Sequence, residues 1–141
     1  MITSGGAAAI RCYTLTQFES EFTVKLLKGK GIRFDIRNVP YNRAANKSLK
    51  FDYTASGCKI AESGAQELSI DSVTAIHDTP ALIKIKNDGK YVKVSVDCAD
   101  IYFSATDLLS TEWIILEALE KSEILVYGIK YSELAEDGKL E

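Results

Sequence analysis

The segment Ala81–Asp97 alternates apolar and polar residues on either side of the dipeptide Asp88-Gly89. This alternation is typical of half-buried β-strands, and Asp-Gly suits the two-residue turn of a β-hairpin. A three-residue loop would set Ile83 opposite Lys93, which mixes the apolar and polar faces. We predict the two-residue Asp88-Gly89 loop, because the register of a hairpin follows its hydrophobic face. It gives the apolar pairs Ile85–Val92, Ile83–Val94 and Ala81–Val96.

Four further segments have the patterns of strands. Residues 32–36 and residues 49–53 alternate strictly, so each has one apolar face and one charged face. In residues 68–76 the alternation changes phase, which a β-bulge would repair. Residues 123–131 are apolar on both faces, which indicates a strand that is central in a sheet or covered by a helix.

Residues 16–29 are predicted to form a first helix. The motif Thr16-Gln17-Phe18-Glu19 matches the S/T-x-x-E capping box that often begins a helix. A strand fits the same segment, because Phe22, Val24 and Leu26 alternate with polar residues. We predict the helix because lysines gather near its C-terminal end, where cations suit the helix dipole. The apolar residues of its face are Phe18, Phe22 and Leu26.

A second helix is predicted to begin at Ser104. Serine is a favoured N-cap residue, and Asp107 lies near the positive end of the predicted helix dipole. Apolar residues follow at helical spacing and form one stripe. The stripe comprises Leu108, Leu109, Ile115, Leu116 and Leu119.

These elements predict an α+β fold in the order α-β-β-β-β-β-α-β, with a mostly antiparallel sheet of about six strands and two helices. The 141 residues are 46% apolar and 26% charged, as in a single globular domain. Residues 1–9 are expected to be a flexible N-terminus, residues 10–131 the domain, and residues 132–141 an acidic, mobile tail. No apolar run is long enough to span a membrane and no signal peptide is recognisable, so a cytoplasmic location is expected.

Residues with catalytic or metal-binding chemistry are few and scattered. Cys12, Cys58 and Cys98 form no C-x-x-C pair, and His77 is the single histidine. Metal sites usually draw on closely spaced ligands, so no metal is expected. Neither G-x-x-x-x-G-K-[ST] nor G-x-G-x-x-G occurs, so no nucleotide cofactor is expected. The chain is predicted not to be an enzyme; the alternative is acid–base chemistry by Asp and Glu residues that the fold brings together.

Charge is divided unevenly along the chain. Residues 1–60 hold ten Lys and Arg against four Asp and Glu, whereas residues 61–141 hold seven against sixteen, for a net charge of −3. A basic segment such as Lys25–Lys50 can bind phosphate groups or nucleic acid, although the overall acidity opposes long-range attraction to phosphate. The candidate basic face comprises Arg33, Arg37, Tyr41 and Arg43.

The acidic half provides an opposite surface, with the candidate acidic face Glu112, Glu117 and Glu120. Segregated charge orients a protein and speeds its encounter with a charged partner. We therefore predict a small non-enzymatic binding protein, such as an inhibitor, immunity-type or accessory factor, whose partner is another protein or a second copy. One alternative is a phosphate-ligand or nucleic-acid-binding module that uses residues 25–50. In another, the basic half simply folds against the acidic half.

Overall fold

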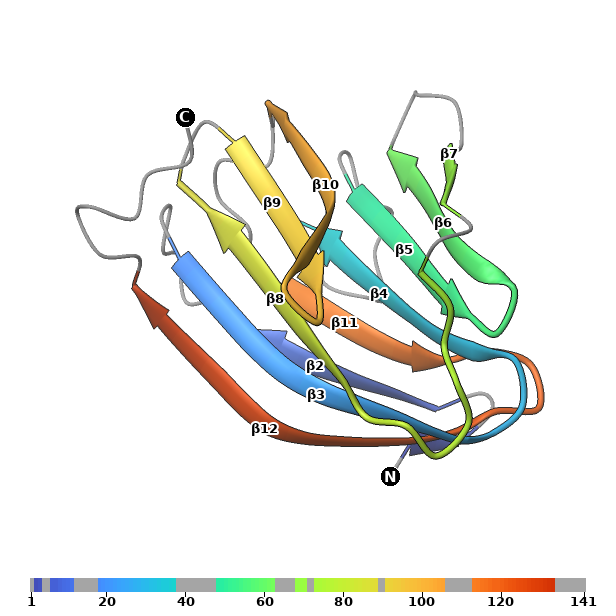
Figure 1. Ribbon diagram of the computed structural model, residues 1–141. Coiled ribbons are helices and arrows are strands. Elements are labelled where there is room, and N and C mark those ends of the chain that lie inside the picture. The colour runs from blue at the N-terminus through green and yellow to red at the C-terminus, as the bar shows by residue number, and fades with distance from the viewer. Residues whose placement is uncertain are drawn as a thin grey trace.

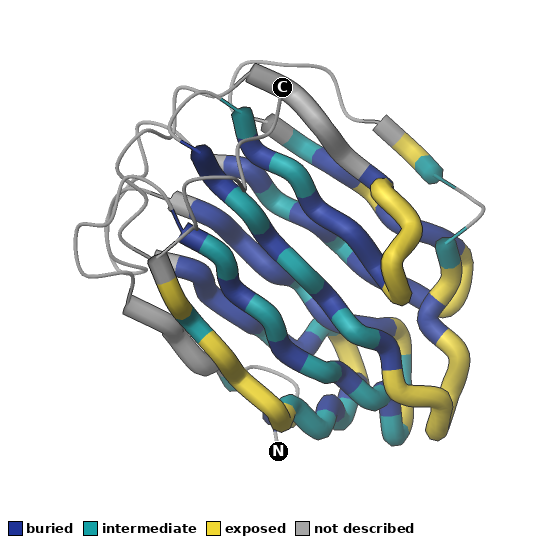
Figure 2. The backbone as a smooth tube through the Cα atoms, turned by 60° about the vertical axis from the view of Figure 1, so that its left-hand side comes forward, coloured by how far each residue is buried: buried dark blue, intermediate teal, exposed yellow. Residues whose placement is uncertain are grey.

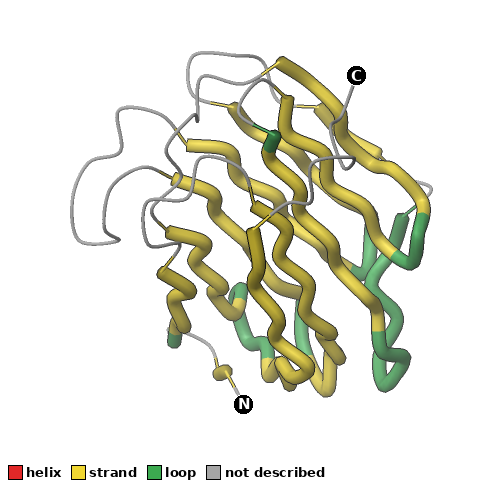
Figure 3. The backbone as a smooth tube through the Cα atoms, turned by 90° about the vertical axis from the view of Figure 1, so that its left-hand side faces the viewer, coloured by secondary structure: helices red, strands yellow, loops and turns green. Residues whose placement is uncertain are grey.

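Every regular element of the described chain is a β-strand (Figure 3). The computed structural model describes residues 2–3, 6–11, 18–37, 48–62, 68–70, 73–88, 91–105 and 113–133. No helix occurs among these residues. The predicted α+β fold with two helices is therefore wrong, and the described chain is all-β.

Within the described residues, the strands form two six-stranded antiparallel sheets that face each other as layers (Figure 1). Sheet A has the order β1 (Ile2–Thr3), β12 (Glu123–Glu133), β3 (Phe18–Lys28), β8 (Ala81–Asn87), β9 (Tyr91–Val96) and β10 (Ala99–Ala105). Sheet B has the order β2 (Ala7–Arg11), β11 (Trp113–Ala118), β4 (Gly31–Arg37), β5 (Ser48–Thr54), β6 (Gly57–Glu62) and β7 (Leu68–Ile70). The β3–β4 and β11–β12 connections each pass from one sheet to the other.

The hydrophobic core lies between the two sheets. Along β3 and β8, buried residues alternate with partly exposed ones over the whole strand, as the period of two requires (Figure 2). At the centre, Phe34 stacks on Phe51 of sheet B, with 4.9 Å between ring centroids. Phe22 of sheet A meets Phe34 edge-on at 6.1 Å. Both ring geometries are favourable, so this cluster joins the sheets through their largest apolar side chains.

Residues 18–28, predicted as part of a helix, form strand β3. A spacing of four residues places Phe18, Phe22 and Leu26 on one face of a helix, but it does the same in a strand, because four is a multiple of two. Ser20 and Val24, which lie between them, are also buried. Burial at every second residue fits only the strand. The predicted helix 16–29 is therefore wrong, and the strand alternative is confirmed from Phe18 onward.

The second predicted helix is also wrong, because residues 113–118 form strand β11 between β2 and β4. Ile114 and Leu116 belong to the core between the sheets, whereas Ile115 is buried on the opposite side of the strand. The sequence of a strand that is buried on both faces does not alternate between apolar and polar residues. In this segment the consecutive apolar residues therefore fitted the apolar stripe of a helix as well. Ser104 lies in β10, and residues 106–112 lie outside the described chain.

The β8–β9 hairpin forms where it was predicted, but its register is shifted by two residues. A shift of two leaves every side chain on the same face, so the apolar pattern does not distinguish the two registers. The turn decides between them: Asp88 N donates to Tyr91 O (3.2 Å), and Tyr91 N donates to Asp88 Oδ1 (2.7 Å). The predicted Asp88-Gly89 loop is therefore wrong. The observed pairs include Ile83–Val96, Ile85–Val94, Lys86–Lys93 and Asn87–Val92.

The other predicted strands correspond to β4, β5 and β12, while residues 68–76 are a strand only at Leu68–Ile70 in the described part. Strands β2, β6 and β10 were not predicted. At the N-terminus, expected to be flexible, Ile2–Thr3 pairs with β12 and Ala7–Arg11 pairs with β11. Residues 134–141 of the predicted tail lie outside the described residues.

Residues 73–80, here called the strap, lead from sheet B to sheet A across one end of the sandwich (Figure 1). Hydrogen bonds attach the strap to both sheets, so it holds this end of the sandwich closed. They are Tyr53 Oη to Thr74 O (3.2 Å), Ala75 N to Thr54 O (2.8 Å), His77 Nε2 to Gly29 O (3.0 Å) and Asp78 N to Leu26 O (2.8 Å).

The β3–β4 and β11–β12 turns lie against each other at the same end. Gly31 N donates a buried hydrogen bond of 2.9 Å to Ser122 Oγ, and Leu119 N donates to Gly31 O at 3.0 Å. Gly29 has φ +93°, and a Cβ there would lie 2.1 Å from the carbonyl oxygen of Lys121. Only glycine fits such a position, because it tolerates positive φ and lacks a side chain.

Candidate binding face on sheet B

The outer face of sheet B carries a row of polar residues that crosses five strands. Each residue stands directly opposite the next in the strand register, and the row alternates in charge before it ends on a hydroxyl. At the usual spacing between strands, a row over five strands is roughly 19 Å long. We call it the charged row, and it comprises Glu117 (β11), Arg33 (β4), Asp52 (β5), Lys59 (β6) and Ser69 (β7).

The centre of the charged row is a two-pronged ion pair between Arg33 and Asp52. Arg33 Nε donates to Asp52 Oδ1 at 2.6 Å, and Nη2 donates to Oδ2 at 2.9 Å. The side chains are 35% and 23% exposed, so the pair is ordered by its geometry and still open to solvent. The hydrogen bond to Asp52 raises the pKa of Arg33, burial opposes this, and the carboxylates of Asp52, Glu117 and Asp35 raise it further. Arg33 is therefore firmly cationic.

This pair keeps hydrogen-bonding capacity for a ligand. A guanidinium has five N–H donors and a carboxylate has about four acceptor positions, of which the pair uses two each. The remaining donors and acceptors lie side by side on the outer face of the sheet. The arrangement therefore suits a ligand that donates and accepts hydrogen bonds at neighbouring atoms.

A second row on the same face is partly closed to solvent. Ile115, Asp35 and Lys50 stand opposite one another on β11, β4 and β5. Asp35 and Ile115 are each only 1% exposed although they lie on the side away from the core between the sheets. The candidate face thus has a buried carboxylate and a buried apolar side chain directly beside the half-exposed Arg33–Asp52 pair.

The outer face of sheet A has ion pairs of a looser kind. Glu21 lies 3.8 Å from Lys84 and 3.6 Å from Lys130, and Lys93 lies 3.3 Å from Asp100. Each of these lysine–carboxylate contacts is single and longer than the two hydrogen bonds between Arg33 and Asp52, and such surface ion pairs contribute little order or stability. Sheet B therefore offers the better preorganised polar surface of the two.

The two predicted charged faces meet on this surface. Arg33 of the basic face stands directly opposite Glu117 of the acidic face, and Glu120 is exposed in the turn that follows β11. Arg37 is paired in register with Trp113. The other predicted site residues lie outside the described chain: Tyr41, Arg43 and Glu112.

Sequence reasoning did not select Asp52, Lys59 or Ser69 as site residues. The available signal was the alternation of residues 49–53, which places Asp52 on the polar face of its strand, away from the apolar side chains. Pairing of β4 with β5 then brings Asp52 to Arg33, but the segment between these strands is too long for its length to fix the register.

The cysteines and the histidine form no joint site among the described residues. Cys58 is buried in β6, and burial raises the pKa of its thiol to about 11, so it is protonated at neutral pH. Cys98 is exposed in the β9–β10 turn, and His77 belongs to the strap. The part of the chain that the structure describes contains no group of three or more His, Cys, Asp and Glu placed to hold a metal ion.

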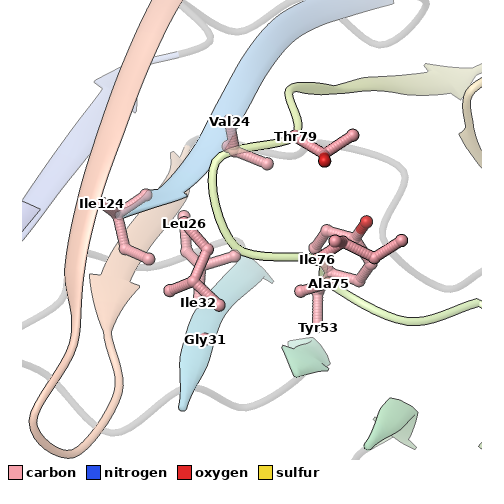
Figure 4. A pocket seen from close by; sticks show the side chains of 9 residues that line it. All are labelled: Val24, Leu26, Gly31, Ile32, Tyr53, Ala75, Ile76, Thr79 and Ile124. Atoms are coloured by element: carbon pink, nitrogen blue, oxygen red, sulfur yellow. The ribbon is translucent and has the colours of Figure 1, made fainter. Parts of the chain in front are cut away.

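A small apolar pocket lies between the sheets under the strap (Figure 4). Its walls come from both sheets, and Ile76 and Thr79 of the strap lie at its edge. The free space holds about one water molecule. The pocket is therefore a packing gap at the closed end of the sandwich and not a site for an organic ligand.

Comparisons with known proteins show which solved structures share this architecture. No protein family and no curated protein matches the sequence. Among solved structures, sheep galectin-11 in complex with glycerol superimposes with a TM-score of 0.66 and 10% identity, over 94% of this chain and 98% of that one. The fold is galectin-like.

Two further structures share the galectin-like fold. Congerin II, liganded with lactose and MES, has a TM-score of 0.63 and 8% identity, with 89% of this chain and 99% of that chain covered. The carbohydrate-binding module CBM66 from Bacillus subtilis has a TM-score of 0.60 and 13% identity, with 89% and 78% covered. At such identities the likeness establishes the fold alone, since one fold serves many functions.

A search of the described residues for a helix that is long and apolar enough to cross a membrane finds none.

Proposed function

We propose that this chain is a non-enzymatic carbohydrate-binding protein that takes its ligand on the outer face of sheet B. The observation that carries the proposal is the two-pronged Arg33–Asp52 pair at the centre of the charged row. The galectin-like fold supports it, because solved structures with this fold include a carbohydrate-binding module and a lactose-liganded protein.

The chemistry of the pair suits sugars. Neighbouring hydroxyls of a sugar each donate and accept hydrogen bonds, and the pair presents fixed N–H donors next to fixed carboxylate oxygens. Because Arg33 and Asp52 already hold each other in place, their side chains lose little conformational freedom on binding. Lys59 and Ser69 extend the polar surface toward β7, and Glu117 extends it toward β11.

The charges of the row favour a neutral ligand over a phosphate. Arg33 has Asp52 on one side and Glu117 on the other, so its positive charge is compensated locally. A phosphate group placed there would meet two carboxylates as well as the guanidinium. Sugar hydroxyls carry no such penalty, because they interact with either charge.

Glycan binding by the intact protein and by two pairs of variants tests the proposal. Arg33→Met and Asp52→Asn remove one partner each from the pair on sheet B. Glu21→Gln and Lys84→Met do the same to a loose ion pair on sheet A and serve as matched controls. Binding to a panel of di- and oligosaccharides that includes lactose is measured by calorimetry.

We expect both sheet B variants to weaken binding by at least about tenfold, because a hydrogen bond with a charged group contributes about 1.5–3 kcal/mol. The sheet A controls should stay within about twofold of the wild type, because Glu21 and Lys84 lie on the other sheet, away from the proposed binding face. Failure of the folded wild type to bind any glycan would overturn the proposal, and so would an equal loss in the controls. Binding to an oligonucleotide at low salt, with no glycan bound, would support the phosphate-binding alternative instead.

A further inference from the structure

Within the described residues, one edge of sheet A has no neighbouring strand along most of β12. On one side β12 pairs with β3 along its length, whereas on the other β1 pairs only with Glu123 and Ile124. Among the described strands, none covers residues 125–133 on that side. Tyr127 and Ile129 on this stretch are 43% and 52% exposed. A strand edge that no neighbouring strand covers, and that carries exposed apolar side chains, is a template for another strand.

A bulge interrupts the open edge near its middle. The register passes from Tyr127 opposite Thr23 to Lys130 opposite Glu21, so Gly128 and Ile129 together face one residue of β3, Phe22. Gly128 has φ +65°, in the left-handed region. The side chain of Lys130, which follows directly, is 77% exposed. A bulge bends and twists a strand, and an exposed lysine opposes the approach of a second strand.

We propose that the Gly128–Ile129 bulge, together with the exposed Lys130 that follows it, prevents the β12 edge from pairing with the same edge of a second copy of this chain. A symmetric antiparallel pair requires the same stretch from both copies. The stretch left open by β1 is residues 125–133, and its midpoint is Ile129, the second residue of the bulge. The bulge therefore disrupts the backbone at the two-fold axis of such a pair. This inference does not depend on the proposed carbohydrate site.

Deleting Gly128 would make β12 a regular strand. Tyr127 would still stand opposite Thr23 and Lys130 opposite Glu21, with Ile129 now alone opposite Phe22. Since Phe22 points into the core, Ile129 would turn inward and become buried. We expect the deletion variant to unfold at a higher denaturant concentration than the wild type, because it buries an exposed isoleucine.

The decisive measurement is self-association by sedimentation velocity across a wide range of protein concentration. We expect the Gly128 deletion to associate at a concentration about tenfold or more below that of the wild type. The matched control is Gly128→Asn, because asparagine tolerates the left-handed region and its Cβ would lie 3.7 Å from Thr23 Oγ1, an ordinary contact. This control should associate like the wild type.

Equal association of the deletion variant and the wild type would overturn the proposal. If the deletion variant fails to fold, Lys130→Thr provides the second test, because it removes the edge charge and leaves the bulge in place. It should shift association in the same direction by a smaller factor. An unchanged profile for Lys130→Thr, together with an unfolded deletion variant, would also overturn the proposal.

Discussion

The hydrogen bond between Gly31 N and Ser122 Oγ joins the two turns that cross between the sheets, and Ser122→Ala removes it. Ser122 is 1% exposed, and the bond is buried at 2.9 Å. Without the hydroxyl, the N–H of Gly31 loses a buried partner. Leaving a buried donor unsatisfied costs about 1–3 kcal/mol in the free energy of unfolding. The hydroxyl also donates to Glu120 O at a longer 3.3 Å, so the main loss falls on Gly31.

The expected size of the effect sets the assay. The entropy of unfolding near the melting temperature is about 2.1 cal/mol/K per residue, so this chain should lose roughly 3–10 °C in melting temperature for that free energy. Urea unfolding should show a lower midpoint and an unchanged slope, because the surface exposed on unfolding stays the same.

Ser132→Ala is the matched control, since Ser132 is exposed on β12 and a surface change usually alters stability by about 0.5 kcal/mol or less. A loss below about 0.5 kcal/mol in Ser122→Ala, equal to that of the control, would refute the reasoning. It would mean that water or a shifted turn satisfies Gly31 N at little cost.

Three further predictions follow from the core and the thiols. Phe34→Ala should lower the free energy of unfolding by about 3–5 kcal/mol, because it removes a fully buried ring that stacks on Phe51; urea unfolding measures this, and Phe34→Leu should lose clearly less. Cys98 should react with a thiol reagent at mildly alkaline pH while Cys58 stays protected, since burial raises the Cys58 pKa to about 11; equal rates would contradict this. Stability should fall as pH rises from about 9 to 11, because the unfolded Cys58 thiol loses its proton before the folded one does, and the raised pKa of Tyr53 acts in the same direction. The fall should be smaller in Cys58→Ala, and an identical pH profile would argue against the buried thiol as its source.

Local patterns predicted the strands whose alternation is clean. Residues 32–36, 49–53 and the hairpin Ala81–Asp97 each have one apolar face, which is the pattern of a sheet packed on one side. The predictions were wrong where the spacing of apolar residues fits both the period of a helix and that of a strand. In residues 18–28 the spacing of the phenylalanines fits a helix as well as a strand, and a chance capping box favoured the wrong one.

Strand β11 shows a different reason for failure. Its side chains are buried on both faces, including Ile115 on the outer face, so the run carries no period of two. Only its place between β2 and β4 explains the burial, and that place depends on pairings with segments far away in the sequence. With β11 predicted as a helix, the strands expected at residues 32–36 and 49–53 were assigned to the same sheet as the β8–β9 hairpin, whereas they belong to sheet B.

Two residues of the candidate site, Arg33 on β4 and Glu117 on β11, were selected from the sequence, but their arrangement in space was not. Arg33 and Glu117 were selected for their charge alone, as parts of two separate faces. The register of sheet B sets them opposite each other and adds Asp52 between β4 and β6. Such neighbours across strands come from pairing, and pairing is not encoded at any one position.

The crossing of the chain between sheets has a consequence for how the protein is made. Central strand β3 needs β12, and β4 needs β11, yet these partners come near the C-terminal end of the described chain. Ser20 and Lys130, joined by a hydrogen bond, are 110 residues apart. During synthesis β3 and β4 therefore each lack a neighbouring strand on one side until residues 113–133, which contain β11 and β12, have been made. Closing such long loops makes folding slow, and the unpaired edges of β3 and β4 make the nascent chain prone to aggregation until then.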